Sequence, residues 1–189
     1  MNNLNIAFIS HGAGPMPLLN DPDHTQLVAY LQSLAGKREK PSAILLISAH
    51  WEVAVATITA SAKPNMIYDY AGFPPETYQL QYPSPGEPVL AVKVQQALQY
   101  AAIAVKLDQK RGYDHGLYVP LMLMYPQADI PAIQLSLVNN LNVEQRLAIG
   151  KALQALDYDN LLVIGSGFSF HNMRAFFTPD TKDRRSKNQ

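Results

Sequence analysis

Five histidines are the residues of this chain best suited to chemistry near neutral pH. His11 and His50 directly follow apolar runs or nearly so, His171 follows another within a few residues, and His115 follows a fourth after a short turn; the fifth is His24. Neutral imidazole is the commonest metal ligand among side chains, and an unbound ring can accept or donate a proton near pH 7. Four of these histidines are therefore candidate metal ligands or acid/base groups.

Three other polar residues lie close to these candidates but have less specific signals. His24 lies in the turn before a predicted helix, which favours a surface or capping role. Glu52 is two residues beyond His50, and Asp114 precedes His115. Each carboxylate could orient an imidazole or join a metal site, or it could form a solvated ion pair; the sequence leaves both alternatives open.

The elements that must position these histidines alternate between strands and helices. Short apolar runs predict strands at 4–10, 43–49, 53–59, 102–107, 130–137 and 161–164, and helical spacing predicts helices at 27–36, 89–100, 118–125 and 143–156. This alternation predicts an α/β fold, a layered domain with a mostly parallel central sheet flanked by helices. The ends of parallel strands share one crevice, so we expect the four histidines to meet there.

The chain between residues 63 and 88 is rich in proline and tyrosine. Regular helix or central strand is disfavoured there, because proline lacks the backbone donor. A loop of this length in a compact domain is usually a functional lid or a packing excursion. Overall we expect one catalytic-type α/β domain over residues 1–177, followed by a polar, disordered tail at 178–189.

Composition excludes several function classes. The 189 residues include 15 Lys and Arg against 15 Asp and Glu, with 48% hydrophobic residues, which suits one globular domain and gives no surplus of positive charge for nucleic acid or anionic lipid. With no cysteine, disulfides, thiolate zinc sites, iron–sulfur clusters and a cysteine nucleophile are excluded. The absence of a signal-like start or a long apolar stretch predicts a cytoplasmic protein.

Two glycine-containing segments resemble phosphate or nucleophile loops only in part. His11-Gly-Ala-Gly and Gly165-Ser-Gly complete neither the dinucleotide fingerprint nor the P-loop. Ser166 and Ser169 near His171 would suit a hydrolase triad, but the Gly-x-Ser-x-Gly elbow is missing. Nucleotide binding and serine hydrolysis are therefore disfavoured.

Taken together, six motifs resemble one enzyme family. The motifs, in order, are Ser10-His11-Gly-Ala-Gly-Pro-Met-Pro-Leu-Leu19, Ile47-Ser-Ala-His50-Trp-Glu52, Tyr68-Asp-Tyr-Ala-Gly-Phe-Pro74, Asp114-His115-Gly116, Val119-Pro-Leu121, and Gly165-Ser-Gly with His171-Asn172. As a set they resemble the class III extradiol ring-cleaving dioxygenases, in the branch similar to 4,5-DOPA extradiol dioxygenase. The resemblance runs from residue 4 to about residue 175.

The resemblance implies an activity and a set of residue roles. It implies a mononuclear non-haem Fe(II) enzyme that uses O₂ to open the ring of a small, DOPA-like catechol beside its two hydroxyl groups. By the same resemblance His11 and His50 bind the metal, His171 is the acid/base, and His115 lies in the substrate pocket. Zn(II) could occupy such a site in the purified protein, but it cannot perform the redox step.

One feature of the family pattern is missing from the chain. The family's third metal ligand lies beyond the His171-Asn172 motif, and no matching segment follows here. We therefore expect an impaired iron site unless Glu52 or His115 substitutes, together with exposed apolar surface that favours a homo-oligomer. The alternatives are an inactive metal- or ligand-binding module of the same fold, or a zinc-dependent hydrolase.

Overall fold

The structure is a computed structural model that describes residues 5–37 and 39–168. His171 and the predicted tail at 178–189 lie outside these residues. The described strands are β1 (Asn5–Ile9), β2 (Ala43–Val53), β3 (Ala56–Thr59), β4 (Val105–Asp108), β5 (Ala132–Val138) and β6 (Leu161–Ser166). The described α-helices are α1 (Thr25–Gly36), α2 (Pro88–Tyr100), α3 (His115–Met124) and α4 (Val143–Gln154).

The strands form one mostly parallel sheet in the order β1-β6-β2-β5-β3-β4. Strands β1, β6, β2 and β5 are mutually parallel, whereas β3 pairs antiparallel with β5 and parallel with β4. The predicted α/β layered fold is therefore confirmed. The carboxyl ends of β1, β6 and β2 lie side by side and form the carboxyl-end edge of the sheet, where ligands bind in such folds.

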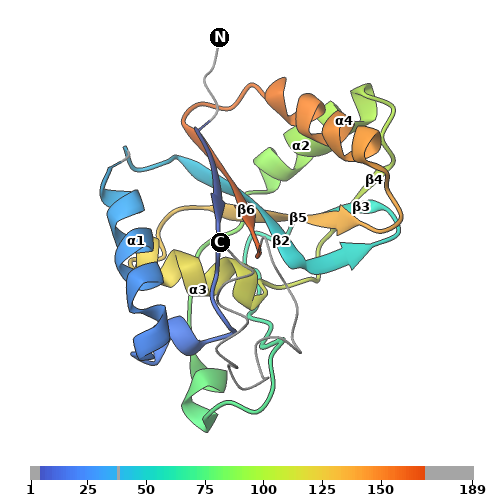
Figure 1. The fold of residues 1–189 in the computed structure, drawn as a ribbon. Helices are drawn as coiled ribbons and strands as arrows, with labels where there is room; N and C mark the ends of the chain where they lie inside the picture. The colour runs from blue at the N-terminus through green and yellow to red at the C-terminus, as the bar shows by residue number, and fades with distance from the viewer. Residues whose placement is uncertain (1–4, 38, 169–189) are drawn as a thin grey trace, which may run out of the picture.

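Helices cover both faces of the sheet, with α1 and α3 on one side and α2 and α4 on the other (Figure 1). Alternation along β2 explains the two layers, since Ile44 and Leu46 are buried in the core beside α3, and Ala43 and Leu45 in the core beside α2. Both faces of β2 are apolar, as expected for a central parallel strand.

Two strands differ from the sequence prediction in ways that affect the site. The strand expected to end at His50 continues to Val53, and its pairing with β5 shifts between Ser48 and Glu52. Irregularities of this kind re-aim side chains near active sites. Strand β4 runs antiparallel to β1, β6 and β2, so the carboxyl end of β4 does not lie at the carboxyl-end edge of those strands. The segment 109–114 instead carries the chain from β4 back to that edge, where His115 lies.

The proline-rich segment 63–88 contains one short 3-10 helix, η3 (Pro75–Gln79), and no longer regular element. Its fold depends on tyrosine hydroxyls that donate to backbone carbonyls. Tyr68 donates to the Leu80 carbonyl at 2.7 Å, and Tyr70 to the Thr77 carbonyl at 2.6 Å. Together with isolated bridges from Met66 to Tyr113 and from Gly86 to Ala132, these bonds shape the loop without a regular strand.

Strand β1 forms one edge of the sheet and exposes two large apolar side chains. Ile6 is 58% exposed and Phe8 is 65% exposed. Exposed apolar side chains on a sheet edge favour association with another chain. Among the residues that the structure describes, no helix is both long enough and apolar enough to cross a membrane.

Candidate metal centre

Three imidazoles meet at the carboxyl-end edge of the sheet. One ligand atom from each of His11, His50 and His115 lies within 4.8 Å of the other two. His11 Nε2 and His50 Nε2 are 2.9 Å apart, and the ring of His115 lies 3.9 Å from that of His50 between centroids. Within the described part of the chain the structure thus brings three of the four candidate histidines together.

Each histidine is positioned by a different local backbone structure. His11 lies two residues after the end of β1 and precedes Gly12, whose φ of +79° turns the chain sharply. His50 lies in the irregular stretch of β2, and His115 is the first residue of α3. His11 and His115 are buried, whereas His50 is exposed.

Ser166, at the end of β6, hydrogen-bonds the Nδ1 side of the His11 ring. The two are joined between His11 Nδ1 and Ser166 Oγ at 3.0 Å, and the serine hydroxyl donates to the Gly116 carbonyl at 2.6 Å. Because the hydroxyl proton is used on that carbonyl, Oγ accepts from His11 Nδ1–H. The neutral ring therefore presents the lone pair of Nε2 to the cluster.

His115 is held by Asp69 from the proline-rich segment. Asp69 Oδ1 accepts from His115 Nδ1 at 2.8 Å and from the His115 backbone N–H at 3.0 Å. Burial raises the pKa of Asp69, but these hydrogen bonds from His115 outweigh it, and the pKa lies below its ordinary value. A carboxylate can only accept, so the proton of neutral His115 is on Nδ1. Its Nε2 then carries no proton and presents a lone pair.

His50 is positioned through its backbone by a buried polar network. Its N–H donates to Ser48 Oγ at 3.1 Å, and the Ser48 hydroxyl donates to Asp114 Oδ1 at 2.8 Å. Asp114 is fully buried and is paired with Arg111 at 3.1 Å, while the Arg111 guanidinium stacks over the Trp51 ring at 4.4 Å. The network compensates the buried carboxylate charge and fixes the strand around His50.

The donor set fits a divalent metal ion. Two nitrogens bound at about 2.1 Å and at right angles lie about 3.0 Å apart, close to the 2.9 Å between His11 Nε2 and His50 Nε2. Three neutral imidazoles with their outer nitrogens hydrogen-bonded or facing a carboxylate are the usual supporting arrangement for such ligands. The residues present could therefore hold a metal ion.

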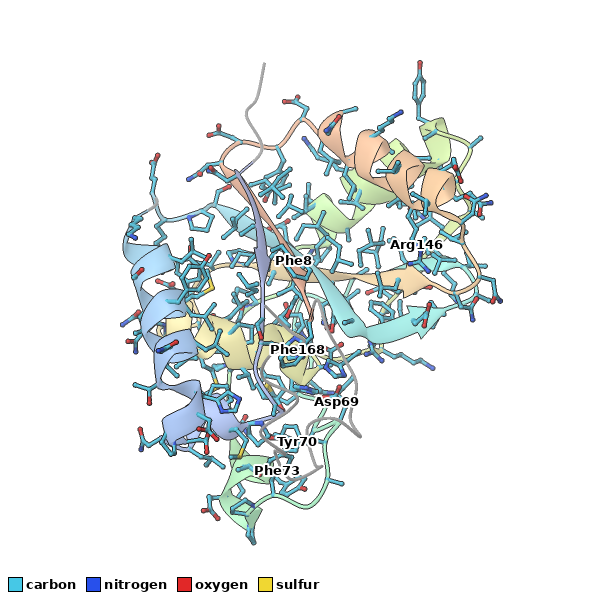
Figure 2. All side chains as sticks on the ribbon, viewed as in Figure 1. Phe8, Asp69, Tyr70, Phe73, Arg146 and Phe168 are labelled. Atoms are coloured by element: carbon cyan, nitrogen blue, oxygen red, sulfur yellow. The ribbon has the colours of Figure 1, made fainter. Side chains whose placement is uncertain are left out.

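Aromatic rings border the three imidazoles. Phe168 packs edge-on against His11 with ring centroids 5.4 Å apart, and Tyr70 packs edge-on against His115 at 5.7 Å. Tyr70 in turn contacts Phe73. Figure 2 shows Asp69, Tyr70 and Phe73 grouped below the sheet near Phe168, so the proline-rich segment contributes both a carboxylate and aromatic rings to the site.

The remaining sequence candidates lie in other settings. His24 pairs with Asp21 at 2.5 Å and accepts from the Ala13 backbone N–H at 3.2 Å, which is a structural role in the loop after β1. Glu52 lies 3.9 Å from Arg146 in an exposed ion pair, outside the imidazole group. Asp114 supports the site through Ser48, and within the described part of the chain its side chain makes no hydrogen bond to an imidazole.

Sequence reasoning assigned no role to two supporting residues. Asp69 was visible only as part of the Tyr68–Pro74 motif, and Ser166 only as part of a glycine-rich turn and of a hydrolase triad that the sequence disfavours. Both contact an imidazole across more than 40 residues of chain, a pairing that spacing does not reveal. The local signal at Asp69 is a single acidic residue among aromatic ones.

Comparison with known proteins identifies the family. Residues 7–183 match the family described as the catalytic LigB subunit of aromatic ring-opening dioxygenase. The chain belongs to this family. Its relatives include "Dioxygenase tasH" of Hapsidospora irregularis, 45% identical over 88% of this chain, and "4,5-DOPA dioxygenase extradiol" of Beta vulgaris, 43% identical over 87% of it.

A solved structure shares the fold of this chain. The Escherichia coli K12 protein JW3007 superposes with a TM-score of 0.72 and 33% identity over 91% of this chain. The chain spans 54% of the Hapsidospora relative, 61% of the Beta relative and 63% of the Escherichia coli structure. It therefore shares the fold and family of proteins that are considerably longer.

Proposed function

We propose that the chain carries the metal centre of an extradiol dioxygenase, which inserts both atoms of O₂ into a small DOPA-like catechol and cleaves the ring beside its two hydroxyl groups. The observation that carries the proposal is the convergence of His11, His50 and His115 in a member of the ring-opening dioxygenase family. Fe(II) is the expected metal for turnover, and Zn(II) is a competitor in the purified protein.

The proposal assigns different roles to the three histidines. His11 and His50 would hold the metal through Nε2, and Fe(II) bound there would supply the redox chemistry with O₂. His115 presents an unprotonated Nε2 that accepts the proton of a substrate hydroxyl. His171, outside the described residues, is proposed as the further acid/base on the strength of the family resemblance alone.

His115 is also close enough to serve as a third ligand, and one variant separates the two roles. His115→Gln removes the imidazole while keeping a polar side chain of similar length. If His115 is the proton acceptor, the variant binds metal with wild-type stoichiometry but loses turnover. If it is a ligand, metal affinity falls together with turnover.

Turnover is tested by oxygen uptake after anaerobic loading with Fe(II). We expect consumption of O₂ with catechols but not with their 1,3-dihydroxy isomers, which cannot bind through two adjacent oxygens. The expected product is yellow and contains both atoms of ¹⁸O₂, whereas cleavage between the hydroxyls gives a colourless diacid. A colourless product or uptake with the 1,3-isomer would contradict extradiol cleavage.

Two alternatives have distinct outcomes in the same experiment. Metal binding without oxygen uptake for any catechol would identify an inactive metal-binding module. Ester or amide hydrolysis with zinc alone would identify a zinc-dependent hydrolase. We further propose a cytoplasmic location, and the substrate and O₂ as partners.

A further inference from the structure

We infer that Asp69 is the positioning residue of the metal centre, a single carboxylate that fixes His115 and faces His50. The inference rests on the proposed metal centre for its consequence, but its geometry concerns only residues of this chain. Asp69 belongs to the proline-rich segment, which is not otherwise part of the sheet edge that carries the imidazoles.

The contacts of Asp69 define what it does. Its Oδ1 accepts two hydrogen bonds from His115, one from the ring and one from the backbone, and these fix both the orientation of the ring and the start of α3. Its Oδ2 lies 3.9 Å from His50 Nδ1. One carboxylate therefore faces the Nδ1 side of two imidazoles whose Nε2 atoms point into the cluster.

The second oxygen of Asp69 matters when His50 becomes a ligand. A ligating Nε2 must carry no proton, and the proton of neutral His50 is then on Nδ1. The carboxylate of Asp69 lies on that side of the ring and stabilises this tautomer.

The hydrogen bonds between Asp69 and His115 also have a structural consequence for the proline-rich segment. Tyr70, the next residue, packs against His115 and hydrogen-bonds within the loop. Asp69 thus joins the aromatic border of the site to the metal ligands, so that the loop and the imidazoles form one unit. A residue with this position should affect metal affinity and histidine tautomers more than global stability.

The experiment compares Asp69→Ala and Asp69→Asn with the matched control Asp108→Asn. Asp108 likewise has a lowered pKa, because it accepts backbone hydrogen bonds from Arg111 and Lys110, but among the described residues it makes no hydrogen bond to an imidazole. Asparagine at position 69 keeps an acceptor for the two His115 bonds and guards against a variant that fails to fold. Circular dichroism and thermal unfolding report folding for all three.

The first readout is the tautomer of His115, measured by ¹⁵N NMR on metal-free protein at about pH 8, where imidazole is mostly neutral. We expect the Nδ1–H tautomer in the wild type and in Asp108→Asn, and a shift toward Nε2–H in Asp69→Ala, with Asp69→Asn between them. An unchanged tautomer in folded Asp69→Ala would overturn the inference.

The second readout is the affinity for Co(II), followed by its visible spectrum. Loss of a supporting carboxylate costs about 10–100-fold in affinity, and we expect this for Asp69→Ala, a smaller loss for Asp69→Asn, and none for Asp108→Asn. Equal affinities in all proteins would overturn the role of Asp69 while leaving the proposed metal centre standing. Failure of the wild type to bind Co(II), with the tautomer still dependent on Asp69, would instead remove the proposed function and keep the positioning role.

Discussion

Gly116 is the position at which one added methyl group tests the support of the site most sharply. A Cβ there would lie 2.5 Å from Ser48 Oγ, 3.1 Å from Asp114 Oδ1 and 3.4 Å from His50 Cδ2. The Ser48 hydroxyl must then rotate away from Asp114 and from the His50 N–H, both of which it now contacts. Gly116→Ala therefore breaks the polar network behind His50 without altering an imidazole.

The expected stability loss follows from those two hydrogen bonds. The bond to the buried carboxylate contributes about 1.5–3 kcal/mol and the bond from the His50 N–H about 1 kcal/mol. Alanine in a helix is more stabilising than glycine by about 0.5–1 kcal/mol, so we expect the free energy of unfolding to fall by about 2 kcal/mol in total. For a chain of this size that lowers Tm by about 4–8 °C.

The matched control is Gly150→Ala in α4, where no described residue other than the chain neighbours and the backbone of the same helix comes within 4 Å of the added Cβ. There the helix gain is unopposed, and we expect Tm to rise by about 1–4 °C. Thermal unfolding followed by circular dichroism gives both values. An unchanged or raised Tm in Gly116→Ala would refute the packing argument, and a lowered Tm with wild-type Co(II) affinity would show that the network does not govern His50.

Three further predictions concern separate parts of the molecule. Ser166→Ala removes the acceptor for His11 Nδ1, and calorimetric titration should show Co(II) affinity lowered about 10–100-fold; wild-type affinity would contradict the role assigned to this serine. Tyr113→Phe removes a buried hydroxyl that donates to a β5 carbonyl at 2.6 Å, so urea unfolding should show a loss of about 1–2 kcal/mol, against none for Tyr100→Phe, whose residue is 97% exposed. The exposed edge of β1 predicts a homo-oligomer that Phe8→Lys dissociates, and sedimentation showing a monomeric wild type would contradict it.

Local patterns in the sequence predicted the sheet and its helices because each element depends on nearby residues. The apolar run at 43–49 and the helical spacing at 143–156 correspond to β2 and α4. The direction of β4 could not be predicted in this way, because it depends on pairing with β3 across a long connection. The path by which His115 reaches the site was therefore not foreseen.

The sequence predicted that His11, His50 and His115 lie together, but not which residues support them, and the metal and catalytic roles of these histidines stay predictions. His11 and His50 were expected beside one another because β1 and β2 end at the same edge. Asp69 and Ser166 acquire their roles only when the loop and β6 are placed in space. Hydrogen bonds between residues distant in the chain leave no periodic signal in the sequence.

The central claim is that His11 and His50 together hold one metal ion, and calorimetric titration of the metal-free chain with Co(II) tests it most directly. We predict one ion per chain in the wild type and in His24→Ala, whose histidine lies in a loop outside the cluster. We predict no specific binding in His11→Ala or His50→Ala. Wild-type binding in either of those two variants, or loss of binding in His24→Ala, would contradict the account.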